Sequence, residues 1–179
     1  MKYYTGVGSR STPQDVGELI EKLAFKFATE GYTLRSGGAD GADSYFENGA
    51  KEYLIRSPKQ MYDIYIPWNN FSGRKKGLNY LVASEYSTFK EAKEIAASIH
   101  PAWDRCSDGA KALHTRNVYQ VLGHNLDSPS SFLIAYAEPT KSGVKGGTNT
   151  AWMLVKKFSV PCFNLYVEED KNRLVGYLK

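Results

Sequence analysis

Cysteine is scarce in this chain, because only Cys106 and Cys162 occur among 179 residues. The two residues lie far apart in the sequence, with no second cysteine pair and no histidine at a usual metal-ligand spacing. A disulfide scaffold and a structural zinc site are therefore not expected, and we predict no metal. A chain of this length buries enough surface to fold without either one. Both thiols are expected to stay reduced, as in a cytosol.

Long hydrophobic runs are also missing. No segment approaches the roughly 18 to 20 apolar residues that span a bilayer, and the N-terminus lacks the basic-then-apolar pattern of a signal peptide. We therefore expect a cytoplasmic protein with no membrane contact. The net charge of +4 is too diffuse to predict nucleic-acid binding by itself, although it permits anionic ligands.

Strand-like and helix-like patterns alternate along the chain. β-Prone segments are expected at 2–8, 32–35, 61–66, 131–136 and 160–166. Helical periodicity separates them, at 13–30, 42–53, 89–99, 109–122 and 148–158. This order predicts an α/β fold, a Rossmann-like, doubly wound, mostly parallel sheet with helices on both faces. We expect one domain over residues 1–179, with an irregular excursion or lid near 69–87.

The first helix carries a recognisable start signal. Thr12 is a good N-cap residue, Pro13 suits the first helical position, and Asp15 stands where a capping box has its acid. The sequence therefore predicts that the Thr12 side chain caps this helix.

Three junctions between a strand and the next helix are rich in glycine. They lie at 6–10 (Gly-Val-Gly-Ser-Arg), 36–41 (Ser-Gly-Gly-Ala-Asp-Gly) and 143–150 (Gly-Val-Lys-Gly-Gly-Thr-Asn-Thr). In an open parallel sheet such junctions meet at the carboxyl edge, and free N–H groups at helix starts suit a phosphate. Neither the phosphate-loop nor the Gly-x-Gly-x-x-Gly spacing is present, which disfavours a phosphate-loop NTPase and a standard dinucleotide dehydrogenase.

Together with 114–117 (His-Thr-Arg-Asn) in a later helix, these loops form four ordered motifs between Gly6 and Ala151. In that order they resemble the SLOG superfamily, which groups the Smf/DprA DNA-processing proteins with the LOG nucleotide phosphoribohydrolases. The second loop is most similar to the DprA side.

This resemblance implies a nucleotide or nucleotide-derived ligand, with its phosphate held by the glycine loops and Arg116. In the LOG motif a glutamate is taken as catalytic, and Met153 stands at that position here, so no catalytic residue is assigned and we lean against an enzyme. The resemblance implies the following ligand-binding residues: Gly6, Gly8, Ser9, Arg10, Ser36, Gly37, Gly38, Ala39, Asp43, Arg116, Asn117, Gly146, Gly147, Thr148 and Thr150.

Several alternatives remain open at this level. Asp43 could cap its helix or position a ribose or base. The chain could bind single-stranded DNA as a DprA-like recombination mediator, with basic residues such as Arg10 and Lys145 supplying charge. A second alternative is cleavage of a nucleotide N-glycosidic bond. Superfamily members often pair their subunits, so the resemblance also implies a homo-oligomer.

Overall fold

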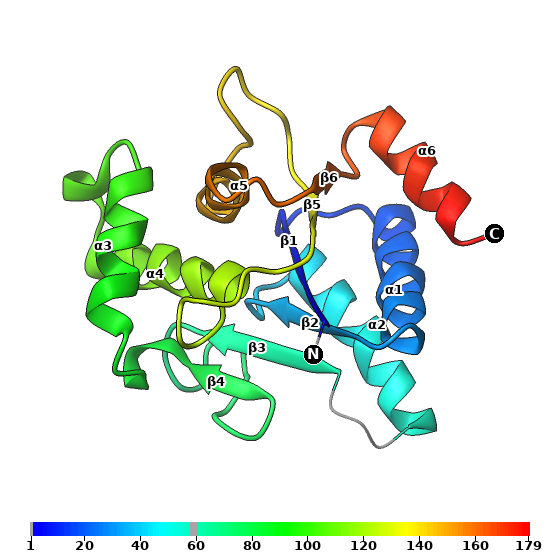
Figure 1. The fold of residues 1–179 in the computed structure, drawn as a ribbon, viewed down its shortest axis with the longest axis horizontal. Helices are drawn as coiled ribbons and strands as arrows, with labels where there is room; N and C mark the ends of the chain where they lie inside the picture. The colour runs from blue at the N-terminus through cyan, green and yellow to red at the C-terminus, as the bar shows by residue number, and fades with distance from the viewer. Residues whose placement is uncertain (1, 58–60) are drawn as a thin grey trace.

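The computed structural model describes residues 2–57 and 61–179. Its centre is a six-stranded parallel sheet in the order β4-β3-β2-β1-β5-β6 (Figure 1). The strands are β1 (Lys2–Gly8), β2 (Tyr32–Ser36), β3 (Tyr62–Ile66), β4 (Tyr80–Val82), β5 (Leu133–Tyr136) and β6 (Cys162–Asn164). The predicted Rossmann-like α/β arrangement is confirmed.

Six helices cover the two faces of this sheet. Helices α1 (Gln14–Thr29), α2 (Ala42–Arg56) and α6 (Glu168–Tyr177) pack on one face, and α3 (Phe89–Ile99), α4 (Asp108–Leu122) and α5 (Thr148–Lys157) on the other (Figure 1). Within β3, Ile64 and Ile66 belong to the first core and Tyr65 to the second, as the two-residue period of a strand requires. β3 therefore contributes buried side chains to the cores on both faces of the sheet.

The strand order reverses beside β1. The chain runs outward from β1 through β2 and β3 to β4, and then returns to place β5 against the other side of β1. The loops that follow β1 and β5 consequently leave the same edge of the sheet as direct neighbours. This is the switch point at which open α/β sheets bind ligands.

The segment 69–87 is more regular than the sequence predicts. It contains β4 and a short 3-10 helix, η1 (Ala83–Glu85), joined to the rest by turns. β4 is only three residues long and pairs with β3 at the sheet edge. So short a strand gives little periodic signal in the sequence.

Two further local features differ from the expectations. The Thr12 hydroxyl donates to the Ser9 carbonyl at 2.7 Å instead of capping α1, and Pro13 occupies the N-cap position. Helix α6 was not predicted, because Leu174 is its one buried residue and no apolar stripe marks it.

Within the described residues, no helix has the length and apolarity needed to cross a bilayer.

Helices α1 and α2 pack closely at Gly49. A methyl group there would lie 2.2 Å from the Glu21 carbonyl oxygen and 2.8 Å from Cβ of Ala24. We predict that Gly49→Ala lowers the free energy of unfolding by about 1–3 kcal/mol, the usual cost of overpacking. Urea denaturation measures this directly.

The matched control is Gly176→Ala in α6, where nothing lies within 4 Å of the added methyl group. Its free energy of unfolding should be unchanged or raised by up to about 1 kcal/mol, because alanine favours a helix over glycine. Equal stability of the two variants would contradict the close packing of α1 on α2.

Candidate functional site

A cavity of about 710 Å³ lies at the carboxyl edge of the sheet, where the loops after β1 and β5 are neighbours. Many of the predicted site residues line it, and they come from all three glycine loops and from α4. They are Gly8, Ser9, Arg10, Ala39, Asp43, Arg116, Asn117, Gly146, Gly147 and Thr148. The structure thus brings four segments that are far apart in the sequence around one space.

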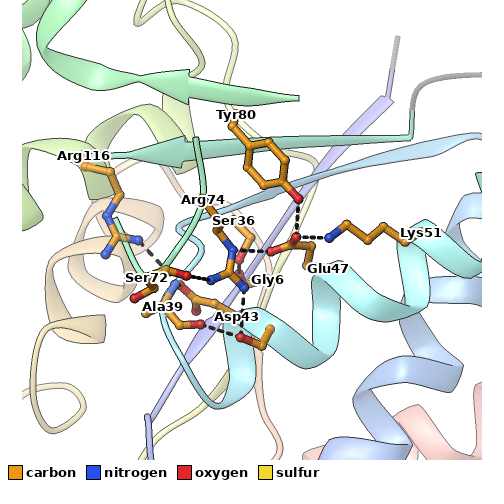
Figure 2. Close-up of polar contacts among 11 residues, drawn as sticks. Gly6, Ser36, Ala39, Asp43, Glu47, Lys51, Ser72, Arg74, Tyr80 and Arg116 are labelled. Carbon is orange, nitrogen blue, oxygen red and sulfur yellow. Dashed lines mark hydrogen bonds and ion pairs between the residues drawn. The ribbon is translucent and has the colours of Figure 1, made fainter. Parts of the chain in front are cut away.

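The other predicted residues, Gly6, Ser36, Gly37, Gly38 and Thr150, are not part of the cavity lining. The Ser36 hydroxyl donates to the Gly6 carbonyl at 2.7 Å and so joins β2 to β1 (Figure 2). A methyl group on Gly37 would lie 1.1 Å from Nη1 of Arg116. Ser36 and Gly6 therefore join two strands, and Gly37 packs against Arg116 of the cavity lining.

Asp43 is the buried acid of the site, with 3% of its surface exposed. Its carboxylate accepts the Ala39 N–H at 3.3 Å and lies 3.5 Å from Nη1 of Arg116 (Figure 2). It also accepts the Gly8 N–H at 3.2 Å. Burial raises the pKa of Asp43, while Arg116 and the two N–H donors act against that rise. The side chain therefore joins the first two glycine loops to α4.

Arg116 is buried beside this acid, and burial lowers its pKa while Asp43 acts in the opposite direction. Its Nε–H has no hydrogen-bond partner among the described residues. A buried guanidinium with an unpaired donor on a cavity wall is well suited to an anionic ligand.

Gln120 and Asn117 extend the contacts of α4 to the last glycine loop. With the Gln120 amide assigned in the orientation that satisfies both of its polar atoms, its oxygen accepts the Gly37 N–H at 2.7 Å and Nη1 of Arg116 at 2.8 Å, and its nitrogen donates to Asn117 Oδ1 at 3.0 Å. Asn117 Nδ2 then donates to the Gly147 carbonyl at 2.8 Å. One helix therefore fixes the second and third loops relative to each other.

The second loop is also braced from outside by Glu47 (Figure 2). This carboxylate accepts Arg74 Nε and the Tyr80 hydroxyl, each at 2.6 Å, and also Lys51 Nζ. Burial raises the pKa of Glu47, but these hydrogen bonds outweigh it and the net pKa is lowered.

Arg74 transmits this support to the loop. Its Nη2 donates to Ser44 Oγ at 3.0 Å, and Ser44 Oγ donates to the Ala39 carbonyl at 2.9 Å. No residue of 69–87 belongs to the cavity lining in the described part of the chain. The segment expected as an excursion or lid therefore contributes a brace behind the second loop.

Sequence reasoning missed the aromatic part of the cavity. Tyr136 ends β5, Tyr166 follows β6, and their rings lie 5.5 Å apart at the cavity wall. Glu138 also lines the cavity and pairs with Lys145 at 2.9 Å. Residues directly after a parallel strand reach the ligand edge of a sheet, so strand position was the signal that could have identified them.

His114 lies on α4 at another part of the cavity lining. Its Nδ1 is 2.7 Å from the Thr150 hydroxyl, and its ring centroid lies 4.3 Å from that of His100, with the two rings tilted by 55°. Burial, with the neighbouring His100 and Arg116, lowers the pKa of His114 to about 4, so the imidazole is neutral at neutral pH.

Comparison with known proteins supports the fold. No protein-family model and no curated protein matches the chain. A solved structure of the Moco carrier protein of Chlamydomonas rheinhardtii is similar, with a TM-score of 0.50 and 18% identity over 100% of this chain and 85% of that one. A structure of the single-stranded-DNA-binding DNA processing protein A of Helicobacter pylori gives a TM-score of 0.38 and 16% identity, over 99% and 80% of the two chains. The first likeness shows that the chain has a Rossmann-like fold.

The buried pair of Asp43 and Arg116 leads to a stability prediction. We expect Arg116→Met to lower the free energy of unfolding by about 3 kcal/mol, because it leaves the Asp43 carboxylate buried without its cation. In the double variant Asp43→Asn/Arg116→Met the loss should be smaller than the sum of the single losses by about 1–3 kcal/mol. Urea denaturation of all four proteins gives this coupling energy.

The exposed Arg56 provides the control, since Arg56→Met should change stability by less than about 0.5 kcal/mol. Strictly additive losses at positions 43 and 116 would show that the two side chains do not support each other.

Proposed function

We infer that this protein binds a phosphorylated small molecule that carries an aromatic heterocycle, of the nucleotide or nucleotide-derived class. The observation that carries the proposal is the single cavity in which three glycine loops, a buried arginine and two tyrosines meet. Its volume falls within the roughly 300–1,000 Å³ typical of small-molecule sites.

The glycine loops are the proposed phosphate end. Gly147 and Thr148 stand at the start of α5, where the first N–H groups of a helix have no partner within the helix. The positive end of the helix dipole favours an anion there. Arg10 and Arg116 on the same cavity add charge, and a guanidinium group has the geometry to bind phosphate oxygens in a bidentate manner.

Tyr136 and Tyr166 are the proposed heterocycle end. Tyr136 is partly buried and Tyr166 is half-exposed, so a planar ring bound at their side of the cavity would cover apolar surface that now faces solvent. Aromatic pairs in offset or tilted contact add about 0.5–1.5 kcal/mol beyond the area they bury.

Binding without turnover agrees best with the residues present. Met153, at the position of the acid in the LOG motif, is not among the cavity-lining residues in the described part of the chain. Of the lining acids, Asp43 is engaged with the loops and Glu138 with Lys145. The similar structure from Chlamydomonas rheinhardtii is named as a carrier protein, a role in which a ligand is held. The four motifs support our assignment of the chain to the SLOG superfamily.

Arg10 gives the clearest test, because it is exposed at the cavity and has no role in the buried network. We predict that Arg10→Ala weakens nucleoside monophosphate binding about tenfold, since a charge-assisted hydrogen bond is worth about 1.5–3 kcal/mol. Native mass spectrometry of the purified protein should first identify any co-purified phosphorylated molecule and the number of subunits. Calorimetry with AMP, GMP and inorganic phosphate then measures affinity.

Arg56→Ala is the matched control, because Arg56 lies at the end of α2, outside the cavity lining, and its loss should leave affinity unchanged. A single-stranded oligonucleotide titrated at several salt concentrations tests the DNA-binding alternative. Binding of the oligonucleotide with a steep salt dependence, and no binding of the three phosphates, would replace our proposal with that alternative.

A further inference from the structure

Three potential metal ligands meet beside the cavity, although they are spread along the sequence. His100 follows α3, Cys106 follows the short helix η2 (Trp103–Arg105), and His114 lies on α4. One donor atom from each residue lies within 4.8 Å of the other two. Cys106 Sγ is 3.8 Å and 3.9 Å from the two ring nitrogens of His100. Each of the three side chains is partly exposed, so an ion can reach them.

A thiolate and two imidazoles form a ligand set that suits zinc. Zinc bonds of about 2.0–2.1 Å to nitrogen and 2.3 Å to sulfur place tetrahedral donor atoms roughly 3.3–3.6 Å apart. The cluster must therefore contract by about 1 Å at its widest separation. His100 and Cys106 both lie in the connection between α3 and α4, where side chains adjust more readily than within a helix.

The surroundings prepare His114 to be a ligand. Its Nδ1 faces the buried Thr150 hydroxyl at 2.7 Å, which leaves Nε2 for an ion. Metal-binding histidines commonly donate their other N–H to such a partner, which fixes the ring and its tautomer. Thr150, which is not part of the cavity lining, thus contacts the lining residue His114.

His100 makes one long hydrogen bond that an ion bound at the same nitrogen would displace. The Ala102 N–H donates to its Nδ1 at 3.2 Å, so this nitrogen is unprotonated and holds a lone pair. An ion bound there would take the place of a single long hydrogen bond at the end of a helix.

We propose that His100, Cys106 and His114 bind one zinc ion, with a fourth coordination position open toward the cavity. Three protein ligands with one open position are characteristic of zinc sites that accept a water or a ligand atom. His114 belongs both to this cluster and to the cavity lining, so the open coordination position of an ion bound to it would lie on the cavity side. The proposal depends on the cluster alone and holds whether or not a nucleotide binds.

The test uses the full chain after treatment with a chelator and removal of that chelator. Zn²⁺ is added, unbound metal is removed by desalting, and the bound zinc is quantified by elemental mass spectrometry. We expect one equivalent per chain. Co²⁺ serves as a spectroscopic probe, since it should give a thiolate charge-transfer band and the intense visible bands of a tetrahedral site. Cys106→Ser should abolish the charge-transfer band and lower zinc affinity at least tenfold.

Cys162→Ser and His124→Ala are the matched controls, because neither residue belongs to the cluster, and both should retain one equivalent and the cobalt spectrum. Circular dichroism establishes that each variant is folded, and His100→Ala provides a second ligand deletion on the α3–α4 connection. Less than stoichiometric zinc in the wild type, or a charge-transfer band that persists in Cys106→Ser, would overturn the proposal.

Discussion

The buried carboxylate of Asp43 is the interaction on which the site depends. A carboxylate removed from water is costly unless donors and an opposite charge surround it. Here the donors are the backbone N–H groups of Gly8 and Ala39, and the charge is Arg116. The first loop, the second loop and α4 must all be in place for this acid to be satisfied. The hydrogen bonds and the ion pair that satisfy Asp43 therefore hold these three parts of the cavity wall in place without a ligand.

Helix α4 extends this constraint to the third loop through Gln120 and Asn117, which bonds the Gly147 carbonyl. The innermost part of the cavity is thus one hydrogen-bonded network, whereas Arg10, Lys145 and Tyr166 at its margin are more exposed. The buried network and the exposed residues at the margin would therefore have different roles in ligand recognition. Under the proposed function, the inner loops would hold the anion and the marginal side chains would select the molecule that carries it. Preorganisation of this kind reduces the ordering cost of binding.

The fold could be predicted from the sequence because its signals are local. Strand periodicity, glycine junctions and helix patterns each lie within a short segment, and parallel strands bring their following loops to one edge. The polar network could not be predicted in this way. The pairing of Asp43 with Arg116 and the bond from Asn117 to Gly147 depend on packing between distant elements. Capping of α1 by Thr12 was also wrong, because the helix begins one residue later, with Pro13 at the N-cap position.

The same limit explains why the metal-ligand cluster has no signature in the sequence. His100, Cys106 and His114 come together only because α3 packs against α4 and the connection between them folds back. Spacing rules for zinc sites describe ligands on one hairpin or one helix, which is a different geometry.

The last glycine motif links the two sites. Gly147 and Thr148 face the cavity, while Thr150 in the first turn of α5 faces His114. A dication bound through His114 would add positive charge to the wall of a cavity whose other features already favour an anion. Binding free energies are reciprocal, so any gain in anion affinity from the ion must equal the gain in ion affinity from the anion. The short distance along α5 from Thr148 to Thr150 is thus the route by which the proposed anion and the proposed metal ion would influence each other.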